Sequence, residues 1–389
     1  MKYELLAPAG SFPSLIAAIE AGADAIYFGL NEFNMRSSAK NFSLRDLTRI
    51  NKLCGKKVKK YLTLNIIIYE NEIKKLESLI KKIKGKIDAV ICWDISVISL
   101  CKKYKIPFHI STQASVSNSQ ALKFYKQLGA ERVVLARELN LKQIKKLSKL
   151  IDIECFCHGA LCVSISGRCF TSQFLHCKSA NRGECIHPCR RPYTITDHEG
   201  NQLKLVNDQV MSAKDLCTLP FVEKMKKAGI ISFKIEGRNR SPEYVSTVVK
   251  VYRKALDKKL SQKEIELSLE ELRKVYNRGL SSGFYLKMPT SDDFAVNENG
   301  EAKEVKHVIG RVEKYWPKAG VAAIKIFSRT LKLNDEIYIK GDITGLIRHK
   351  VTSMEIDNKK VEKAKKEQSV GIKLPKCKKD DEVYLIKSK

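Results

Sequence analysis

The sequence predicts an α/β fold, a TIM-like (β/α)8 barrel with a Cys-rich insertion after its seventh strand, followed by a small C-terminal β-barrel. Three observations predict it. Short apolar runs alternate with amphipathic helical ones over the first 260 residues. About 70 residues rich in Cys, Gly, Arg and Ser interrupt this alternation, and a turn-rich stretch at 289–300 marks a boundary. We therefore expect a barrel over 1–288, with the insertion at about 157–230, and a second domain over 301–389.

Eight apolar runs in the first part predict strands, at residues 4–6, 25–28, 61–67, 89–92, 108–111, 132–135, 153–156 and 232–235. Seven amphipathic segments separate or follow them, at 14–21, 44–54, 72–83, 96–104, 119–128, 141–150 and 242–257. Gly22, Gly129 and Gly229 stand where helices should end, each shortly before a β run. Eight strands favour a closed barrel. An open doubly wound sheet is the alternative, because periodicity predicts the elements and not their closure.

The second domain begins after a charged helix at 263–276. Six alternating segments predict its strands, at 308–312, 321–326, 336–339, 349–356, 371–374 and 383–386. This small β-barrel resembles the second domain of translation factors, which contacts RNA. Its Lys-rich turns at 359–366 and 376–379 suit a phosphate backbone or, equally, an ordinary solvated surface.

Charge and composition narrow the class of protein. The chain has 72 Lys and Arg against 43 Asp and Glu, a formal net charge of +29. Such a balance indicates a polyanionic partner, RNA or DNA, although a Lys-rich proteome would also produce it. Residues 1–9 lack the features of a secretory signal, and no apolar run approaches the roughly 20 residues of a membrane span. We expect a cytoplasmic protein with no membrane partner.

Eight of the twelve cysteines fall between Cys155 and Cys217. Reduced thiols in the cytosol make a disulfide framework a poor explanation, so ligation is expected. No pair has the two-residue spacing of a zinc knuckle. Thiolates gathered from distant loop positions suit a cubane iron–sulfur cluster, with zinc, inert buried thiols or a catalytic cysteine as alternatives.

Several motifs carry a family resemblance. The segments ECFCHGALCVSISGRC at 154–169 and NRGECIHPCRRPY at 181–193 resemble the signature of the peptidase U32 family, also called collagenase-like proteases. STQASVSN at 111–118, SAKDLC at 212–217 and SFKIEGRNRSPEYV at 232–245 agree with it. The family includes proteins that form 5-hydroxyuridine at the tRNA wobble position, one that hydroxylates a cytidine of large-subunit rRNA, and a pair needed for oxygen-independent ubiquinone hydroxylation.

The resemblance also implies a cofactor, because several members carry a [4Fe-4S] cluster. Carried over by motif, the ligands are Cys162, Cys169, Cys185 and Cys217, with Cys189 as a substitute for any of them. Prephenate is implicated with the RNA-modifying members and is expected as a cosubstrate.

Polar residues at predicted strand ends are the remaining candidates, since barrel chemistry is done at the C-terminal rim. We expect catalytic roles for Arg137, His158 and Glu236. Asn65, Gln113 and Arg238 are expected to bind substrate, with an arginine pair recognising the two carboxylates of prephenate through forked hydrogen bonds. Each has a structural alternative. Glu236, for example, would equally serve to clamp an arginine.

These observations favour an iron–sulfur RNA hydroxylase that acts on the tRNA wobble uridine or on rRNA. A collagenase-like peptidase and an accessory protein of quinone hydroxylation are the alternatives. A homo-oligomer, or a hetero-oligomer with a paralogue, is compatible with all three functions. The chain has no HExxH zinc-protease helix. Cys157 and His158, as neighbours on a strand, point to opposite faces and cannot easily share a proton.

Overall fold

The barrel is closed by hydrogen bonds between its first and last strands in the computed structural model, which describes residues 3–37, 39–165, 167–191, 193–203, 211–296 and 300–389. The eight parallel strands are β1 (Glu4–Ala9), β2 (Ala25–Phe28), β3 (Lys59–Leu64), β4 (Ala89–Cys92), β5 (Phe108–Ile110), β6 (Arg132–Val134), β7 (Asp152–Gly159) and β11 (Ser232–Ile235). Phe233 of β11 lies opposite Leu5 of β1 on one side and Cys155 of β7 on the other. The predicted TIM-like barrel is confirmed, and the open sheet is excluded.

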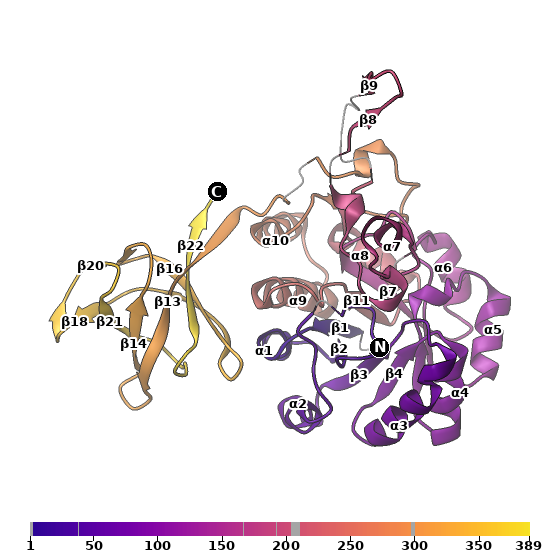
Figure 1. The fold of residues 1–389 in the computed structure, drawn as a ribbon, viewed down its shortest axis with the longest axis horizontal. Coiled ribbons are helices and arrows are strands. Elements are labelled where there is room, and N and C mark those ends of the chain that lie inside the picture. Colours follow the sequence, from indigo (N-terminus) through magenta and orange to yellow (C-terminus); the bar gives the residue numbers. More distant parts are fainter. Residues whose placement is uncertain (1–2, 38, 166, 192, 204–210, 297–299) are drawn as a thin grey trace.

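Helices surround the barrel (Figure 1). They are α1 (Phe12–Glu20), α2 (Asp46–Cys54), α3 (Ile73–Ile83), α4 (Ile95–Tyr104), α5 (Ser119–Gln127), α6 (Leu141–Leu147), α8 (Val222–Lys227), α9 (Pro242–Asp257) and α10 (Gln262–Lys274). Local sequence fixes their starts. At α6, for example, Asn140 Oδ1 accepts a hydrogen bond from the Gln143 amide at 3.0 Å, and Gln143 Oε1 accepts one from the Asn140 amide at 2.9 Å. No described helix is both long and apolar enough to cross a membrane.

The insertion follows β7 and returns to it. Its described elements are α7 (Thr171–His176), the hairpin strands β8 (Ile195–Thr196) and β9 (Gln202–Leu203), and β10 (Asp215–Cys217). Strand β10 pairs antiparallel with the end of β7, and β12 (Leu280–Ser281) pairs parallel with β10. The insertion is thereby anchored at the carboxyl end of the barrel. Residues 166, 192 and 204–210 of the predicted insertion, and 297–299 of the predicted boundary segment, lie outside the described residues.

The C-terminal region is an antiparallel sheet built around its own hydrophobic cluster (Figure 1). Its strands, in spatial order, are β17 (Gly345–Lys350), β16 (Glu336–Gly341), β22 (Glu382–Ser388), β13 (Glu304–Trp316), β14 (Val321–Ile326), β21 (Ser369–Lys373), β18 (Met354–Ile356) and β19 (Lys359–Lys360). A second pair joins β15 (Leu331–Lys332) to β20 (Lys363–Ala364).

One strand predicted in this region is wrong. The segment 349–356 is not continuous, because the chain leaves the sheet at 351–353. There the Val351 amide donates to the Asp335 carbonyl and the Val351 carbonyl accepts from the Asn334 amide. The segment therefore contributes the end of β17 and the whole of β18.

Candidate active site at the barrel mouth

A pocket at the carboxyl ends of the strands brings together five of the six predicted rim residues. Asn65, Gln113, Arg137, Glu236 and Arg238 all line it, with Arg36 and Lys234 beside them. Its free volume is about 40 Å³, room for a few water molecules. A larger ligand would require the long side chains at the mouth to move apart.

The pocket is strongly cationic. Arg36, Arg137, Lys234 and Arg238 face a single carboxylate, Glu236. Arg36 Nη2 lies 3.1 Å from Glu236 Oε1. Burial alone would raise the pKa of Glu236, but Arg36, Arg240 and Arg137 outweigh it and lower that pKa below the ordinary range. Glu236 is therefore ionised at neutral pH and forms an ion pair with Arg36. This ion pair is the structural role that the sequence analysis gave as the alternative to catalysis.

Arg238 is fixed within the pocket wall. Its Nη1 donates to Asn34 Oδ1 at 3.1 Å and to Thr63 Oγ1 at 2.8 Å. Burial, together with the like charge of Arg36, lowers the pKa of Arg238 to about 10, so it stays cationic at neutral pH. A Cβ at Gly29 would lie 2.6 Å from Arg238 Nη1, so this position leaves room only for glycine.

Arg137 is the most informative side chain of the pocket. Its Nη1 donates to the Ala160 carbonyl at 2.9 Å, and its guanidinium lies 4.0 Å above the centre of the Phe156 ring. Nε and Nη2 are buried, yet neither has a hydrogen-bond partner among the described residues. Buried donors without acceptors cost free energy. Nε and Nη2 form one edge of the guanidinium fork, which matches a carboxylate.

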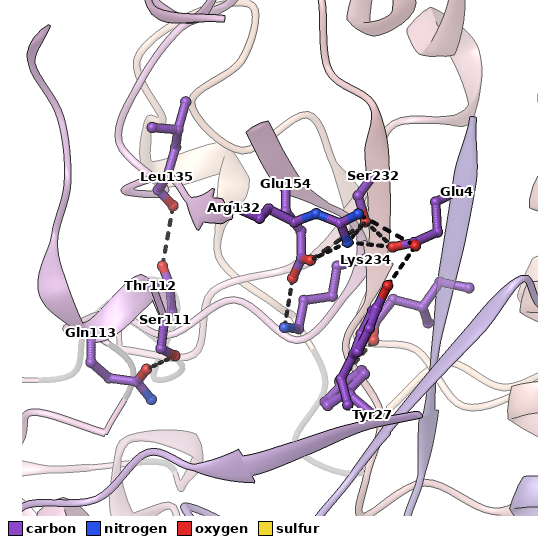
Figure 2. Close-up of polar contacts among 12 residues, drawn as sticks. Glu4, Tyr27, Ser111, Thr112, Gln113, Arg132, Leu135, Glu154, Ser232 and Lys234 are labelled. Atoms are coloured by element: carbon purple, nitrogen blue, oxygen red, sulfur yellow. Dashed lines mark hydrogen bonds and ion pairs between the residues drawn. The ribbon is translucent and has the colours of Figure 1, made fainter. Parts of the chain in front are cut away.

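A buried charge network lies beneath the pocket, inside the barrel (Figure 2). Glu154 of β7 is fully buried and accepts from Lys234 Nζ of β11 at 2.8 Å and from Arg132 Nη1 of β6 at 3.3 Å. Arg132 also pairs with Glu4 of β1. Burial lowers the pKa of Lys234, while Glu154 acts in the opposite direction. Lys234 thus links the barrel interior to the pocket.

Arg36 and Lys234 were not among the expected site residues. Lys234 had a signal, since it is the one cation of the strand run at 232–235 and faces the same side as Ser232. Arg36 lies in a loop between β2 and α2, where no periodicity predicts its direction.

His158 does not lie at the pocket, contrary to expectation. Strand β7 extends to Gly159, three residues beyond its predicted end, so His158 is inside a strand rather than at its rim. Its ring faces α9, with Nδ1 3.4 Å from the Tyr252 hydroxyl. Burial lowers its pKa to about 4. This neutral, enclosed imidazole is a structural group, and a catalytic role is not supported by its position.

The predicted cysteine ligands lie in different surroundings. Burial raises the pKa of Cys189, and the Cys162 and Cys185 thiols act in the same direction. Cys162 also acts to raise the pKa of Arg36, against the effect of burial. Cys169 Sγ lies 3.2 Å from Thr171 Oγ1.

Cys217 is buried within β10, with Sγ 3.7 Å from the Tyr252 hydroxyl, and burial raises its pKa to about 11. In the part of the chain that the structure describes, no three His, Cys, Asp or Glu side chains are arranged to hold a metal ion. The choice of Cys162, Cys169, Cys185 and Cys217 as ligands, with Cys189 as a substitute, therefore stays a prediction.

The sequence was expected to contain no GxSxG pattern of a serine hydrolase, and this expectation is wrong for the pattern itself. Residues 279–283 read GLSSG, which matches GxSxG. A nucleophile elbow places its serine on a sharp turn from a strand to a helix. Here Ser281 lies in the two-residue strand β12, a turn follows, and Ser281 Oγ accepts a hydrogen bond from the Gly283 amide at 3.2 Å. The arrangement is not that of an elbow.

Comparison with known proteins identifies relatives of the whole chain. The model of Peptidase family U32 matches residues 10–294. A protein named collagenase from Porphyromonas gingivalis is 40% identical over 98% of this chain and 97% of its own length. The tRNA hydroxylation protein P1 of Bacillus subtilis is 36% identical over 81% and 78%, and the 23S rRNA 5-hydroxycytidine C2501 synthase of Escherichia coli is 37% identical over 66% and 39%. With these matches and a closed barrel that carries the cysteine-rich insertion over its mouth, the chain belongs to peptidase family U32.

Proposed function

We propose that this protein takes part in RNA hydroxylation, forming 5-hydroxyuridine at the tRNA wobble position, with prephenate as cosubstrate. Two relatives named for hydroxylation of tRNA and rRNA support the reaction class. The net charge of +29 supports an RNA substrate over a neutral quinone.

The observation that carries the proposal is the unpartnered edge of Arg137. A buried guanidinium with two free donors, close to Arg36, Arg238 and Lys234, suits a ligand with carboxylates. Prephenate has two. Arg137 would bind one in a forked pair, and Arg36, which pairs with Glu236 in the same pocket, would contribute positive charge for the other. The uracil would then lie against the amides of Asn65 and Gln113 at the same mouth.

A [4Fe-4S] cluster belongs to the proposal on donor chemistry alone. Cys162, Cys169, Cys185 and Cys217, with Cys189 as a substitute, would supply thiolates, the usual ligands of such clusters. The described side chains do not surround a common metal position, so no step is assigned to the cluster. Iron and sulfide analysis of anaerobically purified wild-type protein and of Cys189→Ser and Cys217→Ser variants tests it. A wild-type protein without iron would refute it.

The function itself is tested by mass spectrometry of tRNA nucleosides. A deletion strain should lose 5-hydroxyuridine and regain it with the wild-type gene, but not with Arg137→Met. An unchanged 5-hydroxyuridine level in the deletion strain would refute the substrate.

A peptidase is the second candidate, because relatives named collagenase match nearly the full chain. Its test is cleavage of collagen or casein by the purified protein. Activity that survives Cys162→Ser and Cys169→Ser would show that proteolysis does not depend on these thiols.

A further inference from the structure

A basic groove runs along the outside of the barrel, between α6 and α8. Its walls carry five lysines, namely Lys142 and Lys145 of α6, Lys224 and Lys227 of α8, and Lys287 after β12. All five are exposed, and none forms an ion pair with a carboxylate in the described ranges. Glu138 is the one acidic residue among the groove's lining side chains. The groove has a free volume of about 590 Å³, far more than the pocket at the mouth.

Four of these lysines form two pairs, one pair on each helix that lines the groove. Lys142 and Lys145 are three residues apart on α6, and Lys224 and Lys227 are three apart on α8, so each pair shares a helix face. The capping box at Asn140 holds the start of α6 in place. Ammonium groups in this arrangement present a positive channel to a chain of phosphates.

The floor of the groove is apolar. Phe284 lines it, and Leu286 and Met288 are 47% and 73% exposed. Exposed side chains of this kind offer a surface to flat, apolar faces. Cations along the walls and an aromatic side chain on the floor are the combination that binds unpaired nucleic acid, with phosphates on the cations and bases against the floor.

The groove and the pocket have adjoining walls. Arg137 lines the pocket and the next residue, Glu138, lines the groove. Tyr285, in the groove wall, donates its hydroxyl to the carbonyl of Phe156 at 2.7 Å, and the Phe156 ring lies in the pocket. A strand whose base enters the barrel mouth would therefore continue directly into the groove.

We propose that this groove binds the single-stranded RNA next to the modified base, with its phosphates on the five lysines and one or two bases against Phe284. The proposal rests on the RNA substrate proposed above and names the surface that holds it.

Fluorescence anisotropy with an anticodon stem-loop RNA tests the groove, measured with the full chain at several salt concentrations. The variant Lys142→Ala/Lys145→Ala/Lys227→Ala should bind more weakly, and the slope of log K against log salt should fall by about 2, at roughly 0.7 per lost single-strand phosphate contact. The matched control is Lys56→Ala/Lys57→Ala/Lys84→Ala. These exposed lysines precede β3 and β4, at the opposite end of the barrel, and their loss should leave the slope unchanged.

A second variant separates stacking from charge. Phe284→Ala should lower affinity by about 5-fold or more with the salt slope unchanged, because stacking releases no counterions. Unfolding temperatures of all variants check that they fold. An unaltered slope in the groove variant, an equal loss in the control variant, or preference of the wild-type groove for anionic vesicles over RNA would overturn the proposal. The two proposals can fail separately. If the groove variants lose RNA binding but the deletion strain keeps its 5-hydroxyuridine, the proposed reaction is refuted and the groove remains an RNA-binding surface.

Discussion

Replacing Arg137 with methionine should separate ligand binding from stability. The wild-type side chain keeps two buried donors, Nε and Nη2, without partners, at a cost of about 1–3 kcal/mol each. The substitution removes that cost. It also removes the hydrogen bond to the Ala160 carbonyl and the contact over the Phe156 ring, together worth about 2–4 kcal/mol. The two effects are similar in size, so we expect the free energy of unfolding to change by less than about 2 kcal/mol.

Ligand binding should respond very differently. A forked pair between the free edge of Arg137 and a carboxylate contains two charge-assisted hydrogen bonds, each worth about 1.5–3 kcal/mol. Losing both weakens binding by at least about 3 kcal/mol, roughly 100-fold. Urea denaturation gives the free energy of unfolding. The rise in unfolding temperature on adding prephenate reports binding, and it should vanish in the variant.

Arg36→Met is the contrasting variant. Arg36 is paired with Glu236, so its loss leaves a largely buried carboxylate without its nearest cation and should lower the free energy of unfolding. The reasoning about Arg137 is refuted if Arg137→Met unfolds several kcal/mol more easily than wild type, or if it keeps the prephenate-induced rise.

Three further predictions concern the barrel and its neighbour. Glu154→Gln removes the buried carboxylate that Lys234 contacts at 2.8 Å, so urea denaturation should show a loss of about 3–5 kcal/mol; a loss below about 1 kcal/mol would contradict a role for this ion pair. His158 has a pKa of about 4 in the folded chain against 6.5 when exposed, so its contribution is complete above pH 6.5 and is lost as the pH falls toward 4. Relative to His158→Gln, the wild-type protein should lose about 3 kcal/mol over that range, and parallel pH profiles would show that the imidazole is not held neutral. Gly345 has φ +79° and a Cβ there would lie 2.5 Å from Ile16 Cγ2 of α1, so Gly345→Val should lower the unfolding temperature by several degrees; an unchanged temperature would mean that β17 does not pack on α1.

The sequence predicted elements well where the signal is local. The runs at 25–28, 89–92 and 232–235 are strands with the predicted bounds. The first two are short continuous apolar runs, as a strand buried on both faces needs. Amphipathic periodicity likewise predicted most helix ends to within a few residues. The error at 349–356 has a non-local origin. The break at 351–353 depends on hydrogen bonds between Val351 and the distant turn at 334–335.

The sequence by itself determined the barrel's strands, the long cysteine-rich insertion and the set of polar residues at the strand ends. Each follows from residues near one another in the chain. Only the tertiary structure decided that β11 closes on β1 and β7, that Arg36 from a loop pairs with Glu236, and that His158 faces α9 rather than the mouth. These outcomes depend on contacts between segments that are in part more than two hundred residues apart, and periodicity carries no information about such contacts.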